Sequence, residues 1–282
     1  MPLLLVLVAM AGVGVRARAG APVERLQALF VNVAESAIFV APAGLAAPHW
    51  FLAVPVARDY DNVRFCKGVA EAACHQPIEY SAQELLSVRG RAEFRLEEAR
   101  ALSAPGTHHL YVTGDAGEPA TLDERSVASM PEVVVRRGDD YVGLLSELFG
   151  VPFVLRPAPL EDGHQTDLRR GADCAALVVY GQRRLGRPLP YVAPRGLFKL
   201  ARELPPGAPI RVGDILNFGF QSAVLSVDTP PLGVLNGEDR VIHTYHGLAE
   251  ETPVSVLPYG SAPFRWLRWP STAARTGNGP GH

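Results

Sequence analysis

Apolar residues recur at helical spacing between Gly171 and Gly186. The apolar positions follow one another at intervals that place them on one face of an α-helix, and they are Cys174, Leu177, Val178, Gly181 and Leu185. Asp173 precedes them and is suited to act as the N-cap, while Gly186 supplies a stop signal. The pattern therefore predicts a helix that begins at Cys174 and packs inward.

Short apolar runs between turn residues dominate the first half of the chain. These runs predict strands over 37–41, 50–57, 62–66, 91–96 and 109–113. Helical spacing instead predicts helices over 24–36 and 80–88. We therefore expect a β-rich module over 21–131, whose last part, 114–131, is a polar linker.

The second half of the chain begins with helical spacing and continues with strand patterns. Asp139 or Asp140 can cap a helix that ends at Gly150, ahead of a proline-rich loop and the Cys174 helix. After a connector with a short helix at 197–203, strand patterns follow at 210–218, 223–227, 240–245 and 253–257. Helices followed by antiparallel strands predict an α+β domain over 132–270. The Gly- and Thr-rich residues 271–282 predict a disordered tail.

Composition limits the class of partner. The 282 residues are 48% apolar, which is enough for one large or two ordinary packed domains. The formal net charge of −2 gives no support for nucleic-acid binding, because such binding needs a clustered basic surface. Cysteine and histidine pairs with zinc-site spacing are absent from the sequence, so we expect no metal and no cofactor.

The first residues have the pattern of an export signal. Residues 1–15 are apolar, and Ala17-Arg18-Ala19 has the small-x-small form of a signal-peptidase site. We therefore expect a signal peptide over 1–20, cleavage near Ala19, and a location in the periplasm or outside the cell. A retained N-terminal anchor is the alternative, because no basic residue precedes the apolar run. After cleavage no segment is apolar over the length that a membrane span requires.

The three cysteines fit an exported protein. Cys66 and Cys74 are eight positions apart and could close a small disulfide loop in an oxidising compartment. Cys174 then remains as the odd thiol, in the first turn of its predicted helix. The partial positive charge of a helix N-terminus favours a thiolate and lowers the pKa of a cysteine below about 8.5. Cys174 is thus a candidate nucleophile, with a small buried core residue as the alternative interpretation.

The order of these parts resembles the NlpC/P60 superfamily of papain-like cysteine peptidases. The resemblance runs over 139–258 and rests on four segments: Leu-Phe-Gly-Val-Pro-Phe at 148–153, Asp-Cys-Ala-Ala-Leu-Val-Val-Tyr at 173–180, Val-Gly-Asp-Ile-Leu-Asn-Phe at 212–218, and Val-Ile-His-Thr at 241–244. It implies a papain-like fold in which the cysteine helix packs on an antiparallel sheet. It also implies hydrolysis of peptide amide bonds in the bacterial cell wall.

The resemblance implies a role for three residues. Cys174 matches the family's nucleophile, and His243 matches the third residue, which orients the catalytic base. Gln221 occupies the position of the base itself, and glutamine cannot accept a proton near neutral pH. The family usually has a tyrosine before the cysteine helix, where this chain has Phe153.

Three interpretations of this site stay open. His243 could act as the base with Gln221 as its orienting residue, or His246 or His164 could supply the base. Alternatively, the domain is a catalytically inactive module that binds cell-wall peptides or a protein partner. Strand alternation directs His243 and His246 to opposite faces, so only one of them can face Cys174 from a regular strand. We therefore expect an exported amidase or endopeptidase with Cys174, His243 and Gln221 as its catalytic residues.

Overall fold

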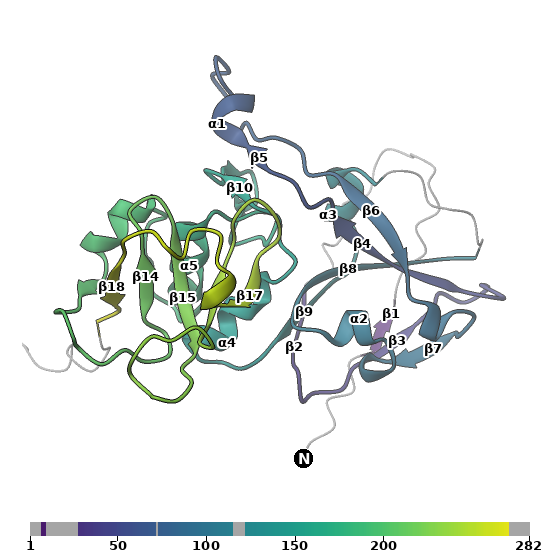
Figure 1. Ribbon diagram of the computed structural model, residues 1–282. Coiled ribbons are helices and arrows are strands. Elements are labelled where there is room, and N and C mark those ends of the chain that lie inside the picture. Colours follow the sequence, from purple (N-terminus) through teal and green to yellow (C-terminus); the bar gives the residue numbers. More distant parts are fainter. Residues whose placement is uncertain (1–6, 10–27, 72, 115–121, 271–282) are drawn as a thin grey trace, which may run out of the picture. The chain divides into compact units, whose positions relative to one another are not determined.

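The computed structural model describes residues 7–9, 28–71, 73–114 and 122–270. The chain is a mixed α+β protein with several sheets and few helices (Figure 1). It divides into two compact units: the first comprises 1–173 with 244–250, and the second comprises 174–243 with 251–282. Apart from strand β1 (Leu7–Ala9), the expected signal peptide lies outside the described residues, as does the expected disordered tail.

A five-stranded sheet forms the centre of the first unit. Its strand order is β2-β9-β8-β4-β6. Neighbouring strands pair antiparallel except β2 and β9, which are parallel. The strands are β2 (Leu29–Asn32), β4 (His49–Pro55), β6 (Tyr80–Glu84), β8 (Gly106–Thr113) and β9 (Glu132–Arg136).

Aromatic side chains fill the core of the first unit. A second sheet, with the order β1-β3-β7, contributes β3 (Ile38–Val40) and β7 (Glu93–Arg95). The ring of Phe94 stacks on Phe39 at 5.1 Å between centroids and meets Trp50 edge-on at 4.9 Å. The Trp50 indole N–H donates to the carbonyl of Arg91 at 2.9 Å, so its one polar atom is satisfied in the core.

Shorter elements complete the first unit. Two small two-stranded sheets pair β5 with β10 in parallel and β11 with β12 antiparallel. The elements are β5 (Tyr60–Asp61), α1 (Asn62–Phe65), η1 (Leu86–Val88), η2 (Leu96–Glu98), α2 (Arg100–Ser103), α3 (Glu124–Ala128), α4 (Tyr141–Leu145), η3 (Ser146–Leu148), β10 (Val154–Leu155), β11 (Pro159–Leu160) and β12 (Gly163–His164).

The structure corrects three local predictions in the first unit. The described part of 24–36 contains strand β2 and not a helix, because this segment pairs with β9 along its length. Most of 80–88 is strand β6, which pairs with β4. The predicted strand at 62–66 is helix α1, whose first turn is capped by the Asp61 carboxylate, which accepts from the Arg64 N–H at 2.9 Å.

The boundary between the units differs from the predicted one at 131–132. Strand β9 begins at Glu132, but it lies between β2 and β8 in the sheet of the first unit, and its three valines are buried. Helix α4 also belongs to this unit and is capped by Asp140, one of the two aspartates predicted for the cap. In the predicted linker, residues 115–121 lie outside the described residues, and α3 forms part of the remainder. The second unit therefore begins at Cys174.

The second unit is built on a six-stranded sheet with the strand order β13-β18-β14-β15-β16-β17. The strands from β13 to β16 in this order pair antiparallel. Helix α5 (Cys174–Arg184) packs against β15 and is followed by η4 (Pro194–Lys199). The remaining elements are β13 (Arg202–Glu203), β14 (Ile215–Asn217), β15 (Ser222–Val227), β16 (Arg240–His243), β17 (Glu250–Pro253), η5 (Val254–Val256) and β18 (Arg265–Arg268).

Helix α5 confirms the helix predicted from the spacing of apolar residues. It begins at Cys174 and runs for 11 residues, the first nine of them buried. Gly186 follows with φ +83° and donates its N–H to the carbonyl of Arg183, which ends the helix. Two strand predictions need correction. Residues 210–218 contain only the short strand β14, and most of 253–257 is η5, a short 3-10 helix, as are the other elements labelled η.

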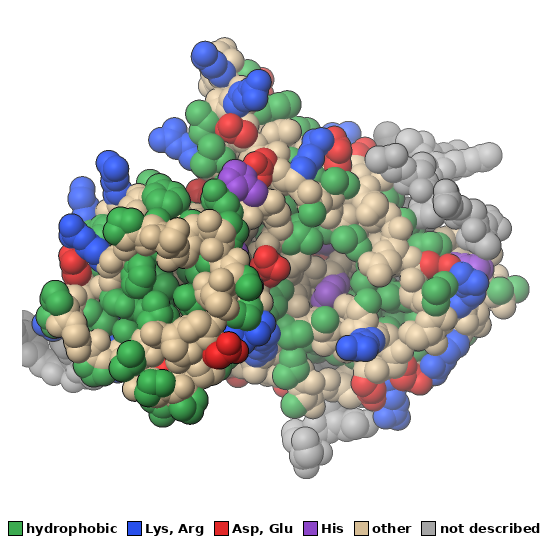
Figure 2. Space-filling view, in the orientation of Figure 1, with side chains coloured by type: hydrophobic (Ala, Val, Ile, Leu, Met, Phe, Trp, Pro, Cys, Tyr) green, Lys and Arg blue, Asp and Glu red, His purple; other side chains and the backbone are tan. Residues whose placement is uncertain are grey.

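Hydrophobic side chains gather on the visible face of the second unit over β14 and β15 (Figure 2). The large hydrophobic side chains most exposed in this unit are Leu232, Val256, Phe220 and Val234. Among the described residues, no helix is both long and apolar enough to cross a membrane.

Burial of His109 makes the stability of the first unit sensitive to acid. His109 lies in β8 and is 8% exposed, and burial lowers its pKa to about 4 from an ordinary value of 6.5. Between these two values the unfolded chain binds more protons than the folded chain, so stability falls as the pH drops from 6.5 to 4. We expect His109 to account for about 3 kcal/mol of this loss.

Replacing His109 by glutamine tests this expectation. The free energy of unfolding in urea should fall less for His109→Gln than for the natural chain between pH 7 and pH 4, by about 3 kcal/mol. Far-UV circular dichroism at pH 7 checks that the variant folds. Equal losses for the two proteins would contradict the assignment.

Candidate active site

Cys174 is the one cysteine of the chain that is not in a disulfide. Cys66 and Cys74 are joined to each other, as their spacing allowed, which leaves the Cys174 thiol. Cys174 is the first residue of α5 and is 4% exposed. The helix N-terminus favours its thiolate, whereas burial favours its thiol, so the two effects oppose each other in setting its pKa.

Gln221 and His243 lie on neighbouring strands of the sheet in the second unit. Gln221 directly precedes β15, and His243 ends β16. The antiparallel register pairs Val224 with Ile242. Continued by one residue, this register puts His243 opposite Ala223, with Gln221 two residues along the same face. Side chains at such diagonal positions come within reach of each other. The sheet therefore places Gln221 where it could orient the His243 imidazole.

The His243 imidazole is held in an aromatic environment. His243 is 3% exposed, and its ring meets that of Tyr259 edge-on at 5.8 Å between centroids. Burial lowers the pKa of His243 to about 4. The imidazole is therefore neutral at pH 7 and can accept a proton. Its low pKa also favours a neutral thiol and imidazole in the resting protein over a preformed ion pair.

A cavity of about 500 Å³ lies close to this imidazole in the second unit. Phe218 lines the cavity and also contacts Tyr259 edge-on at 5.0 Å, so a chain of rings connects the cavity to His243. The cavity combines aromatic rings with two guanidinium groups, and its lining residues are Arg195, Phe198, Asn217, Phe218, Gly219, Pro263, Phe264 and Arg265. This lining suits a ligand that carries an apolar group and a carboxylate.

The two alternative histidines belong to the first unit. The ring Nδ1 of His246 lies 2.5 Å from a carboxylate oxygen of Asp59, and its side chain is 54% exposed. His164 lies in β12, where its Nδ1 accepts the N–H of Thr166 at 3.2 Å. The Phe153 ring lies 5.8 Å from the His246 ring, measured between ring centroids. Of the histidines considered for the base, His243 alone shares a unit with Cys174.

Sequence analysis missed the aromatic and basic residues around His243. Tyr259 lies in the turn region after η5, and Phe264 directly precedes β18. Strand β18 pairs with β14 although about fifty residues separate them. Local patterns do not reveal such a pairing. The one signal in the sequence was the clustering of aromatic residues at 264–269, close to the end of the described chain.

The second unit thus contains a thiol at the start of α5, and a neutral imidazole and an amide side chain on neighbouring strands of its sheet. Among the described residues, no group of three or more His, Cys, Asp or Glu side chains is arranged to hold a metal ion. Comparisons with protein-family models, with curated proteins and with solved structures gave no match.

Proposed function

We propose that this protein is an exported thiol hydrolase that cleaves amide bonds in cell-wall peptides. Cys174 is the nucleophile, His243 is its base, and Gln221 orients the imidazole. One observation carries the proposal: helix α5, which begins at Cys174, packs against β15. Gln221 directly precedes β15, and His243 ends the neighbouring strand β16. The Cys66–Cys74 disulfide supports export.

In the proposed reaction His243 takes the thiol proton as the Cys174 sulfur attacks the carbonyl carbon of the peptide bond. The tetrahedral intermediate then collapses, the carbon–nitrogen bond breaks, and His243 returns the proton to the leaving amine. Water hydrolyses the resulting thioester in the second half of the reaction. His243 is neutral at pH 7, so its ring nitrogen is available to the thiol proton, while its lowered pKa makes it a weaker base than an exposed histidine.

The proposed fold of the catalytic part is NlpC/P60-like. The order of a cysteine helix followed by an antiparallel sheet in the second unit supports it. The family-like segment that precedes the cysteine, 139–173, belongs to the first unit. The structural unit and the region of resemblance therefore have different boundaries.

A non-catalytic peptide-binding module is the second candidate function. The observation that favours it is burial, because Cys174 and His243 are only 4% and 3% exposed. The nearby cavity with Arg195 and Arg265 would serve such a module equally well, because it can bind a peptide carboxylate without cutting the chain.

Incubation of the purified protein with peptide stems released from cell walls separates the two functions. The hydrolase predicts products in which one amide bond has gained one water, detected by mass spectrometry, and a new primary amine for each bond cut. Saturable binding of the same peptides with no product over prolonged incubation would favour the binding module and contradict the hydrolase.

A further inference from the structure

The first unit contains a cavity of about 760 Å³ that the proposed hydrolase does not use. Its walls come from three segments: residues 73–77 around Cys74, helix α3 with its cap residue Asp123, and the β11–β12 hairpin with the loop that follows it. Most of the lining side chains are ionisable, and the lining residues are Ala73, His75, Pro77, Asp123, Glu124, Arg125, Ala128, Leu160, Glu161, Asp162 and Arg170.

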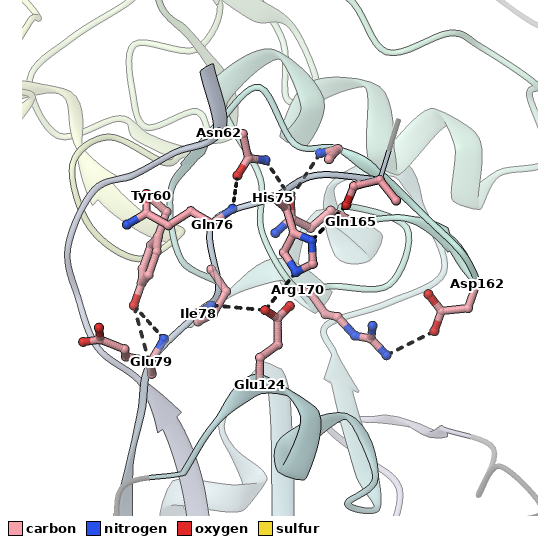
Figure 3. A network of polar contacts seen from close by, with 12 residues as sticks. Tyr60, Asn62, His75, Gln76, Ile78, Glu79, Glu124, Asp162, Gln165 and Arg170 are labelled. Atoms are coloured by element: carbon pink, nitrogen blue, oxygen red, sulfur yellow. Dashed lines mark hydrogen bonds and ion pairs between the residues drawn. The ribbon is translucent and has the colours of Figure 1, made fainter. Parts of the chain in front are cut away.

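One wall of this cavity is an ion pair between His75 and Glu124 (Figure 3). The His75 Nε2 lies 3.0 Å from the Glu124 carboxylate, and its Nδ1 lies 3.3 Å from the carbonyl oxygen of Ala73. Both partners are acceptors, and this arrangement favours the imidazolium form of the ring, which carries a proton on each nitrogen. The hydrogen bond to Glu124 accordingly raises the pKa of His75. The two charges neutralise each other.

A second wall is the ion pair between Arg170 and Asp162, with 3.2 Å between nitrogen and oxygen (Figure 3). Both side chains are mostly buried, at 20% and 13% exposed. Glu124 also accepts the N–H of Ile78 at 3.2 Å, and Asn62 accepts the N–H of Gln76 at 2.8 Å. These bonds fix the backbone that carries His75, so the cavity wall is formed before any ligand arrives.

Three further charges line the cavity: Asp123, Arg125 and Glu161. The Asp123 carboxylate accepts the N–H of Ser126 at 2.7 Å, and this hydrogen bond, with a smaller contribution from the Arg125 charge, lowers the pKa of Asp123. Arg125 and Glu161 are both exposed, and neither forms an ion pair or a side-chain hydrogen bond within the part of the chain that the structure describes. The cavity therefore offers one cation and one anion whose side chains form no hydrogen bond to the described residues, and Leu160 and Ala128 add small apolar surfaces to its lining.

We propose that this cavity binds a small zwitterion of the amino-acid and dipeptide class. The ligand carboxylate pairs with Arg125, the ligand ammonium pairs with Glu161, and the apolar surfaces take its side chains. The volume lies within the usual range for small-molecule sites. The charges of His75–Glu124 and Arg170–Asp162 already pair with each other, although the buried Glu124 Oε1 accepts no hydrogen bond from the described residues. The ligand's charges therefore pair with Arg125 and Glu161.

Isothermal titration calorimetry of the full chain with alanyl-alanine tests the ligand class. We expect saturable binding, weakened about tenfold when the dipeptide is N-acetylated and about tenfold when it is C-amidated, because each change removes one charge-assisted contact. Single alanine as a further probe separates an amino acid from a dipeptide as the preferred size. Absence of saturable binding at millimolar dipeptide, or equal binding of the three dipeptide forms, would overturn the proposal.

Matched variants assign the two contacts. Arg125→Gln and Glu161→Gln should each weaken alanyl-alanine binding about tenfold. Arg125→Gln should leave the affinity for the C-amidated form unchanged, since that form has no carboxylate to lose. Arg100→Gln and Glu93→Gln are the controls, because both residues are exposed in the first unit and neither lines the cavity. Affinity lost equally in controls and test variants would refute the assignment.

Discussion

The Cys174→Ser variant is expected to lose hydrolysis of cell-wall peptides by about 10³-fold or more. Cys174 is the only cysteine outside the disulfide, and serine at this position keeps the size of the side chain but is a far weaker nucleophile. The rate of amine release from purified wall peptides measures the effect. A residual rate within tenfold of the natural protein would mean that Cys174 is not the nucleophile.

Stability and peptide binding provide the control for this variant. The side chain is 4% exposed, and the exchange of sulfur for oxygen changes its volume little, so the free energy of unfolding should change by no more than about 1–2 kcal/mol. Peptide affinity should persist in Cys174→Ser whichever function is correct. A loss of rate with affinity retained thus isolates the chemical step.

The Asp214→Ala variant is expected to destabilise the second unit by about 3–5 kcal/mol. Asp214 is fully buried and accepts two hydrogen bonds of 2.6 Å from the guanidinium of Arg268. It also accepts the N–H of Arg211 at 2.9 Å in the turn before β14. Its removal leaves the Arg268 charge without its carboxylate partner and removes the hydrogen bond that holds the turn. Urea unfolding followed by fluorescence measures the change in the free energy of unfolding.

A surface ion pair in the same sheet is the matched control. Glu203 in β13 lies 3.3 Å from Arg265, and both side chains are about half exposed. Glu203→Gln should therefore cost less than about 1 kcal/mol. If both variants lose similar stability, the special contribution of the buried Asp214–Arg268 pair is disproved.

Local signals in the sequence predicted the elements whose formation depends on local causes. Helix α5 combines an apolar face, a start at Cys174 and a glycine stop, so its bounds could be predicted almost to the residue. The α4 cap was predicted, for the same reason, as either Asp139 or Asp140, and the structure shows that it is Asp140. By contrast, the segment of β2 has helical spacing of apolar residues, but its pairing with β9, about a hundred residues away, decides its conformation.

The unit boundary could not be predicted, because it depends on the same distant pairing. Residues 132–136 look like the first strand of a new domain when only their neighbours are considered. In the structure they complete the sheet of the first unit between β2 and β8. Once this strand joins the first sheet, the chain up to Asp173 belongs to the first unit.

The candidate site was predicted only in part, for related reasons. Cys174 was selected because a helix start is a local feature, and His243 and Gln221 were selected from the resemblance to a family pattern; the catalytic roles of all three stay predictions. Tyr259 and the cavity lined by Phe218 and Phe264 depend on β18 lying beside β14. The charged cavity in the first unit likewise joins three segments that are far apart in the sequence.

The rate of Cys174 alkylation tests the central claim most directly. The disulfide joins the other two cysteines, so iodoacetamide under non-reducing conditions reports on the Cys174 thiol. The account predicts that this thiol reacts faster at pH 7 than an unperturbed cysteine, whose pKa is about 8.5, and that His243→Gln slows the reaction, because the neutral imidazole takes the thiol proton. A rate no higher than that of an unperturbed cysteine, unchanged in His243→Gln, would contradict it.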